Sequence, residues 1–227
     1  MVPFRADLHM HTCHSKDSLS SVGSVLASAV KKGLDAIAIT DHDELSGAFE
    51  ANEKAEAESL KLQVIVGEEV STDQGDLLVY FLKKRIAPGP LGAVLAEVKR
   101  QKAVCCAAHP YDFIRHGINL EKIPAALLGK IDAVEAFNAR VSMQSHNPKA
   151  TQFALSNGKA LLAGSDAHHP SEIGAAYVEF EGISRLDARK LLFSKRKIAG
   201  RLSPAYVHAF SRYAVIRKKL GWKMKKE

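Results

Sequence analysis

Two histidines separated by one residue, His9 and His11, follow a short apolar segment near the start of the chain. Side chains alternate along an extended backbone, so both imidazoles point to the same side and can bind one cation. Asp166 and His168 repeat this spacing far downstream, with a carboxylate in place of the first imidazole. The two segments together predict a metal centre.

Three polar clusters lie between these segments: Thr-Asp-His-Asp at 40–43, Gly-Glu-Glu at 67–69 and Ala-His-Pro at 108–110. Imidazole combined with carboxylate suits Mn, Fe or Zn and argues against Ca or Mg alone. A single histidine is more often a packed or surface residue than a ligand. We therefore assign no ligand role to His116, His146, His169 and His208.

The composition is that of an ordinary globular protein, with 227 residues, 46% hydrophobic and 25% charged. This length supports one domain with a sizeable core. No apolar run has the length of a membrane span, and the first residues already lead into a strand, so we expect no signal peptide. Cys105 and Cys106 are adjacent in an apolar run, which predicts reduced core thiols in a cytoplasmic protein. Cys13, beside the histidines, is expected to be a bystander, with a role as a soft metal ligand as the alternative.

The positive charge is concentrated at the C-terminus. Residues 1–188 hold 19 Lys and Arg against 24 Asp and Glu, a net charge of −5. Residues 189–227 hold 13 against 1, a net charge of +12. This asymmetry indicates either a polyanionic partner for the tail or a solvated tail that aids solubility.

Short apolar strands alternate with segments of helical periodicity. This alternation predicts an α/β fold with a mainly parallel sheet. The polar clusters each follow a predicted strand, and parallel barrels carry their active sites at the C-terminal strand ends, so we expect the clusters to meet at one pole. The expected strands are 6–8, 35–39, 62–66, 76–82, 103–108, 131–136, 160–163 and 177–180. The expected helices are 22–32, 46–60, 91–102, 148–157 and 186–193, with a loop over 117–124.

The motifs Asp-x-His-x-His-Thr, Thr-Asp-His-Asp, Gly-x-Glu, His-Pro and Gly-Ser-Asp-Ala-His occur in this order over residues 7–168. Their combination resembles the PHP (polymerase and histidinol phosphatase) family. The resemblance implies a distorted parallel (β/α)7-type TIM-like barrel over residues 1–201. It also implies two or three divalent metal ions and hydrolysis of phosphoesters.

The resemblance assigns ligand roles motif by motif. His9, His11 and Asp166 resemble the ligands of a first metal, and His109 a ligand of a second. Glu69 resembles the carboxylate that bridges two metals. The third metal would be held by His42, His168 and Asp17, with His14 as a rival to Asp17. We expect Glu69, Asp166 and His168 to be catalytic. Asp7 and Asp41 are expected to orient imidazoles of the ligands. Glu135 is expected either to orient a ligand in the same way or only to end a strand.

The chain departs from the family pattern after the bridging glutamate, where many members have Gly-His and this chain has Gly75-Asp76. A carboxylate can still bind metal, so Asp76 is a candidate replacement ligand. Alternatively, the second site lacks one ligand. Arg115 follows His109-Pro110 by a short loop, and Arg140 follows Phe137-Asn138. Both are candidate phosphate-binding residues, with a surface position as the alternative for each.

The tail over residues 202–227 predicts a basic amphipathic helix. Tyr206, Phe210 and Tyr213 share one face, which we expect to dock on the barrel. An RNA- or DNA-binding flank and a membrane-surface helix are the alternatives.

We expect a metal-dependent phosphoesterase that hydrolyses a small phosphorylated substrate by means of a hydroxide held between two metals. One alternative is a nuclease whose basic tail binds nucleic acid. Another is a non-catalytic barrel that binds RNA or protein, although binding alone would not require so complete a ligand set.

Overall fold

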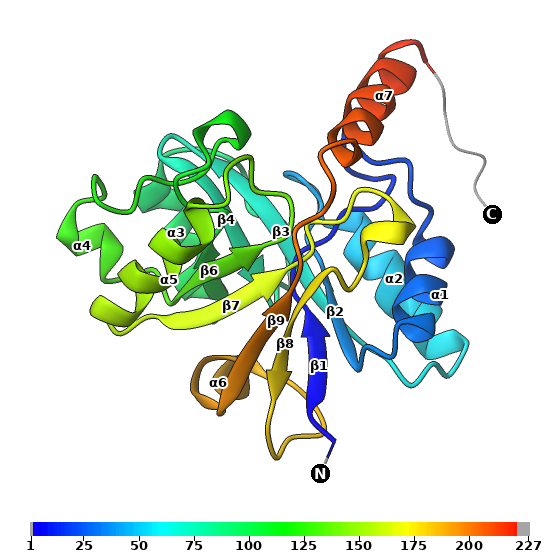
Figure 1. The fold of residues 1–227 in the computed structure, drawn as a ribbon, viewed down its shortest axis with the longest axis horizontal. Coiled ribbons are helices and arrows are strands. Elements are labelled where there is room, and N and C mark those ends of the chain that lie inside the picture. The colour runs from blue at the N-terminus through cyan, green and yellow to red at the C-terminus, as the bar shows by residue number, and fades with distance from the viewer. Residues whose placement is uncertain (1, 222–227) are drawn as a thin grey trace.

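The computed structural model describes residues 2–221 and contains a nine-stranded sheet in the order β7-β6-β5-β4-β3-β2-β1-β8-β9 (Figure 1). Seven strands run in one direction, and β4 and β8 oppose them. The strands are β1 (Phe4–Asp7), β2 (Ala36–Ile39), β3 (Gln63–Thr72), β4 (Gly75–Tyr80), β5 (Val104–Ala107), β6 (Ala133–Asn138), β7 (Ala160–Gly164), β8 (Ala176–Phe180) and β9 (Arg196–Gly200).

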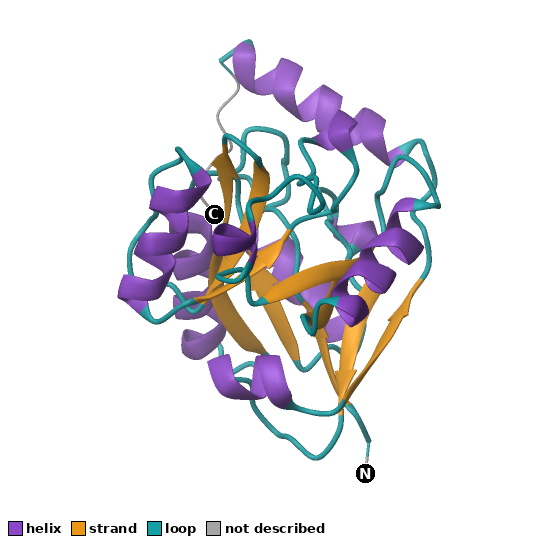
Figure 2. Ribbon diagram, turned by 90° about the vertical axis from the view of Figure 1, so that its left-hand side faces the viewer, coloured by secondary structure: helices purple, strands orange, loops and turns teal. Residues whose placement is uncertain are grey.

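The helices surround this sheet, and α7 lies across one end of it (Figure 2). Helix α1 begins after Ser21, whose side chain accepts a hydrogen bond from the Ser24 backbone, and Gly33 with φ +68° follows its end. Within the described chain, no helix is both long and apolar enough to cross a membrane. The helices are α1 (Val22–Lys31), α2 (Ser46–Ala57), α3 (Leu91–Gln101), α4 (Ala125–Leu128), α5 (His146–Ser156), α6 (Ala188–Phe193) and α7 (Val207–Lys219).

The sheet curves into a nearly closed barrel because β1 and β7 meet at their C-terminal ends. The Leu8 amide donates a hydrogen bond to the Ala163 carbonyl at 3.3 Å. Just beyond, Met10 and Ala167 form a parallel bridge. These contacts bring the first and the last of the predicted metal-binding segments side by side. The predicted α/β barrel is therefore confirmed.

Strand alternation divides the core into two layers. Ala36 and Ala38 of β2 face the barrel interior, where small residues fit, whereas Ile37 and Ile39 face the helices. Cys105 packs on the helix side and Cys106 in the interior, and both are free and buried, as predicted.

The structure corrects the predicted strands in three respects. Half of the strand pairings are antiparallel rather than a minority, because β3 and β4 form a hairpin and β8 pairs with β1 and β9 in the opposite direction. Strand β3 continues through Thr72, so the Gly-Glu-Glu cluster lies within a strand and not after one. Strand β9 was not predicted, because its basic residues resemble a solvated tail.

The C-terminal helix exists, but the predicted docking by its aromatic face is wrong. Tyr206 is 66% exposed and Tyr213 54% exposed, and Phe210 is 38% exposed beside the ring of His169. The buried residues of α7 are instead Val207 and Ala214. Lys223, Lys225 and Lys226 of the predicted tail lie outside the described residues.

Candidate metal centre

The polar clusters converge at the pole formed by the C-terminal ends of β1, β2, β5 and β7. Here histidine and carboxylate atoms form four overlapping groups, in each of which the ligand atoms lie within 4.8 Å of one another. The groups are His9–His11–Asp166, His9–Glu69–His109, His42–Glu69–Asp76 and His11–Asp17–His42–His168.

The first group is built from both ends of the chain. The Nε2 atoms of His9 and His11 lie 3.2 Å apart, and Asp166 Oδ1 lies 3.7 and 3.4 Å from them, respectively. All three side chains are buried. Alternation along the backbone after β1 places the two imidazoles together, as their spacing predicts.

Glu69 faces two sets of histidines with its two oxygens. Oε1 lies 2.9 Å from His109 Nε2, while Oε2 lies 3.2 Å from both His9 Nε2 and His42 Nδ1. Its neighbour Glu68 points to the opposite face of β3 and accepts a hydrogen bond from the Ile86 amide, and burial raises the pKa of Glu68 to about 7. The geometry therefore places Glu69, not Glu68, at the centre of the site.

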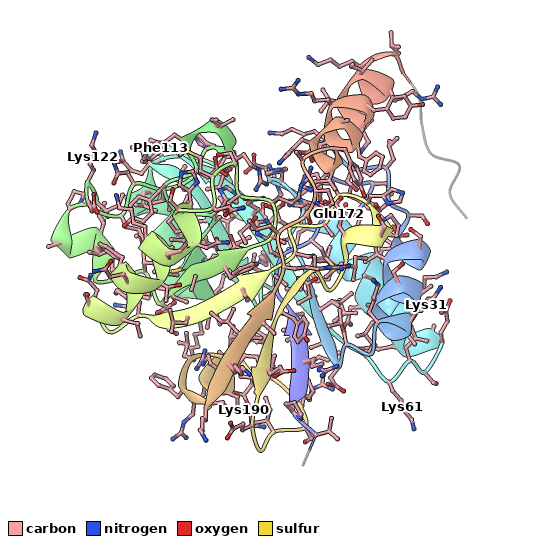
Figure 3. The ribbon with its side chains drawn as sticks, viewed as in Figure 1. Lys31, Lys61, Phe113, Lys122, Glu172 and Lys190 are labelled. Atoms are coloured by element: carbon pink, nitrogen blue, oxygen red, sulfur yellow. The ribbon has the colours of Figure 1, made fainter. Side chains whose placement is uncertain are left out.

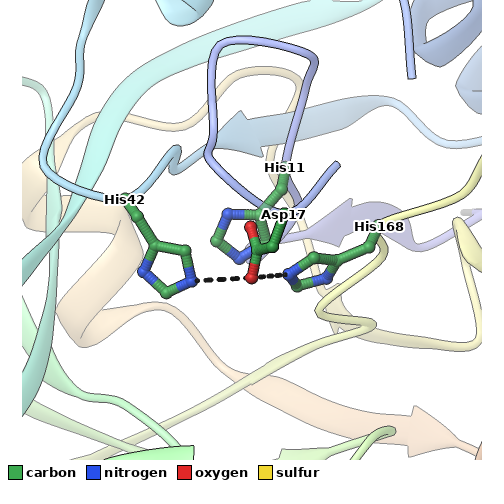
Figure 4. Close-up of side chains that lie close together, drawn as sticks. All are labelled: His11, Asp17, His42 and His168. Carbon is green, nitrogen blue, oxygen red and sulfur yellow. Dashed lines mark hydrogen bonds and ion pairs between the residues drawn. The ribbon is translucent and has the colours of Figure 1, made fainter. Parts of the chain in front are cut away.

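The fourth group includes Asp17, which lies in the loop between β1 and α1. Its Oδ2 atom lies 3.0 Å from His168 Nε2 and 3.5 Å from His42 Nε2 (Figure 4). The rival candidate His14 is turned away from this group and contacts Ser46 and Glu50. The structure thus brings Asp17 into the cluster and leaves His14 outside it.

Asp76 enters the site because β4 runs against its neighbours. The hairpin turn at Gly75, with φ +120°, puts the first residues of β4 at the pole where the parallel strands end. Asp76 there shares a group with His42 and Glu69. Its Oδ1 atom also lies 2.8 Å from Nδ1 of His116, which sequence reasoning left out of the site.

Of the three carboxylates expected to orient imidazoles, one lies beside an imidazole. Glu135 Oε1 lies 2.9 Å from His9 Nδ1, and its other oxygen accepts a hydrogen bond from the His109 amide. Asp41 instead binds the amide and hydroxyl of Thr12, and Asp7 binds the amides of Ser165 and Gly174. The last two carboxylates therefore fix the backbone of ligand-bearing segments rather than an imidazole.

A family model for the PHP domain matches residues 7–180 of this chain. The chain belongs to the PHP domain family. Two uncharacterized proteins of Methanocaldococcus jannaschii are each 32% identical to this chain. The match to the first covers 79% of this chain and 72% of that protein. The match to the second covers 60% of this chain and 82% of that protein. The resemblance drawn from the motifs is thereby confirmed.

Solved structures of similar fold support the barrel assignment. A two-domain protein from Bacteroides vulgatus containing a predicted PHP-like metal-dependent phosphoesterase superposes with a TM-score of 0.69 at 20% identity, covering 87% of this chain and 65% of that one. This PHP chain thus spans less than two thirds of that protein. PsfC from Pseudomonas syringae gives a TM-score of 0.66 at 18% identity, covering 98% and 100%.

The charges of the PHP site fit divalent cations. Burial alone would lower the pKa of His9, but Asp166, Glu135 and Glu69 raise it well above the usual range. Burial alone would raise the pKa of Asp166, but Arg115 and the histidines lower it strongly. Asp166 Oδ1 and Asp17 Oδ1 are buried without a hydrogen-bond partner. Such a cluster of carboxylates requires concentrated positive charge, which metal ions supply.

Two residues that hold the ligands were missed by sequence reasoning. The Ser15 hydroxyl lies 3.0 Å from His11 Nδ1 and accepts a hydrogen bond from the His42 amide. Asn138 Nδ2 donates to Asp166 and to Glu135. Serine and asparagine are common in loops and strand ends, so neither position carries a local signal.

The two candidate phosphate-binding arginines have different surroundings. The guanidinium of Arg115 contacts Asp166 at the edge of the site, and its side chain is 17% exposed. Arg140 is 2% exposed, and its guanidinium contacts Glu172, Ser211 and backbone carbonyls. This placement favours Arg115 and argues against a phosphate contact for Arg140, because the protein occupies the guanidinium of Arg140.

Proposed function

We propose that this PHP protein hydrolyses a phosphate ester of a small molecule and uses two to three divalent ions, of Mn, Fe or Zn. The observation that carries the proposal is the position of Glu69, whose two oxygens face separate histidine sets at 2.9 and 3.2 Å. A carboxylate in this position can join two cations, the arrangement that recurs in metal-dependent phosphatases. Family membership supports a metal-dependent hydrolase.

The ligand side chains divide the site into three parts. His9, His11 and Asp166 would hold one ion. Glu69 would hold a second, with His109 on one of its oxygens and with Asp76, which shares a group with Glu69 and His42. His42, Asp17 and His168 would hold the third. When bound, such ions polarise phosphoryl oxygens and lower the pKa of water for attack on phosphorus.

Arg115 completes the proposed substrate site. Its partly exposed guanidinium lies against Asp166, so a phosphate beside the metals can accept a hydrogen bond from its remaining N–H groups. Asn138, which also binds Asp166 and lies 3.4 Å from Arg115, keeps both groups in place. Arg115 would therefore supply a cationic contact to the phosphate from the chain itself.

Parallel assays of phosphomonoesters, phosphodiesters and oligonucleotides with Mn²⁺ test this proposal. We expect hydrolysis of a small phosphomonoester that disappears on chelation. Preferential cleavage of oligonucleotides would contradict this proposal and favour the nuclease alternative. Metal binding without hydrolysis of any ester would favour a non-catalytic barrel.

The nuclease alternative depends on the basic tail, and the structure does not strengthen it. The Lys218 ammonium points inward and donates hydrogen bonds to the carbonyls of Cys13 and Ser15. It is therefore not presented to a polyanion. Lys219 is exposed and stays available for such a contact.

A further inference from the structure

Helix α7 contacts the barrel through an unusual stripe of small and polar residues. Val207, Ser211, Ala214 and Lys218 recur at spacings of four, three and four, which places them on one face of the helix. The larger aromatic residues Tyr206 and Tyr213 are exposed. Since apolar burial along this stripe is small, the polar contacts fix the position of the helix.

The last turn of α7 holds the loop that leads from His11 to Asp17. Lys218 Nζ donates to the Cys13 carbonyl at 2.6 Å and also to the Ser15 carbonyl. The loop closes on itself, because the Cys13 amide donates to the Ser20 carbonyl at 2.8 Å. Lys218 therefore attaches one closed loop to the end of the helix.

This loop contacts or carries three candidate ligands, His11, His42 and Asp17. Through its hydroxyl, Ser15 lies 3.0 Å from His11 Nδ1 and accepts a hydrogen bond of 2.8 Å from the His42 amide. Asp17, two residues further on, lies between His42 and His168. A shift of the loop would displace Asp17 and release the imidazole of His11 together.

The first turn of α7 is attached to the other side of the same cluster. Arg140 donates to the Val207 carbonyl, to the Ser211 hydroxyl and to the Asp166 carbonyl at 3.2, 2.9 and 3.3 Å. It also pairs with Glu172, which accepts a hydrogen bond from the His168 amide. Figure 3 shows Glu172 below the start of α7.

We propose that α7 positions the fourth group, His11–Asp17–His42–His168, and that Lys218 is the positioning residue at the end of the helix. The proposal rests on the metal centre of the proposed function. The two ends of the helix hold two of the three segments from which this group is built, the one with His11 and Asp17 and the one with His168. Without Lys218, the carbonyls of Cys13 and Ser15 lose this donor, and the loop that carries Asp17 loses this attachment to α7.

The test compares Lys218→Met with Lys219→Met and Lys218→Arg in the full chain. Lys219 is the adjacent, exposed residue of α7, so its variant removes the same charge and keeps the loop contact. Mn²⁺ content and affinity are measured by mass spectrometry and titration, and the melting temperature is measured without metal. Loss of a group that holds a metal ligand in place typically lowers metal affinity by 10–100-fold.

We expect Lys218→Met to weaken the binding of one ion by roughly tenfold or more while the remaining ions keep their affinity, and Lys218→Arg to restore part of the lost affinity. Lys219→Met should bind metal like the wild type. Equal metal affinities of Lys218→Met and Lys219→Met would overturn the proposal. A uniform loss of all ions from Lys218→Met, together with a lower melting temperature of this variant without metal, would also overturn it. Wild-type protein that binds no metal would instead reject the proposed function itself.

Discussion

The Nε2 atoms of His9 and His11 face each other at 3.2 Å, with Glu69 and Asp166 on either side. Two imidazole nitrogens this close cannot both direct a proton toward the other. A shared cation satisfies both lone pairs and the surrounding carboxylates at once. This relationship underlies the predictions on metal content.

Metal analysis should find two to three divalent ions per chain, and Asp166→Asn should lose at least one ion together with hydrolysis. The reason is that Asp166 shares a group with His9 and His11 and is buried. Asp187→Asn is the matched control, because Asp187 caps α6 in an exposed position and asparagine caps equally well. Full turnover by metal-free protein would contradict the metal centre.

Gly164→Ala should disrupt the metal site by displacing His9, which packs against Gly164. A Cβ at Gly164 would collide with the Cβ of His9 and lie 2.7 Å from the His9 amide nitrogen. Such overpacking lowers the free energy of unfolding by roughly 1–3 kcal/mol and should displace His9. At Gly92 in α3 an added Cβ meets only Leu127, at 3.6 Å, so Gly92→Ala should raise stability by about 0.4–1 kcal/mol. Thermal melts and metal content check both variants, and a Gly164→Ala protein as stable and as metal-rich as the wild type would refute the packing argument.

Asp76→Ala should lose one ion, whereas Asp76→His should keep substantial activity, because a carboxylate stands here where many family members have histidine. His116→Ala removes the 2.8 Å contact with Asp76 but leaves the carboxylate, so it should keep the metal content. Metal stoichiometry distinguishes the variants. If Asp76→Ala retains every ion and the full rate, Asp76 is only a hairpin residue.

The metal-binding motifs were predictable because their signals are local. The one-residue spacing of His9 and His11 specifies that their side chains point to the same side. The apolar strand before each cluster specifies the strand end at which that cluster lies. The reversal of β4 could also have been inferred: only Asp73 and Gln74 separate it from β3, whereas a parallel crossover needs a dozen or more residues.

The remaining parts of the site depend on contacts between distant segments. Lys218 and Ser15 are 203 positions apart, and Asn138 reaches Asp166 across the β6–β7 edge. Nothing in the local pattern of α7 distinguishes the stripe through Lys218 from its aromatic face. The aromatic residues have the larger apolar surface, so sequence reasoning selected the wrong face.

Arg115→Ala should raise KM for a phosphomonoester by about tenfold to a hundredfold, the cost of losing a charged hydrogen bond. Arg115→Lys should recover only part of this, because lysine cannot form a two-pronged contact. Metal content should remain near that of the wild type, which separates this variant from Asp166→Asn. The control Arg100→Ala removes an exposed arginine that pairs with Glu97 on α3 and should leave KM unchanged. An unaltered KM of the Arg115→Ala variant would show that Arg115 does not bind the substrate.

The last prediction separates a small-molecule phosphatase from a nuclease. We would change Lys219, Lys223, Lys225 and Lys226 to Gln and keep Lys218, whose ammonium holds the loop at Cys13 and Ser15. The candidate ligands all precede residue 170, so kcat/KM on a small phosphomonoester should not change. If the tail bound nucleic acid, the slope of log affinity against log salt concentration would become shallower by about 0.7–0.9 for each lost phosphate contact. A selective loss of oligonucleotide cleavage with such a flatter slope would establish the nuclease in place of the phosphatase.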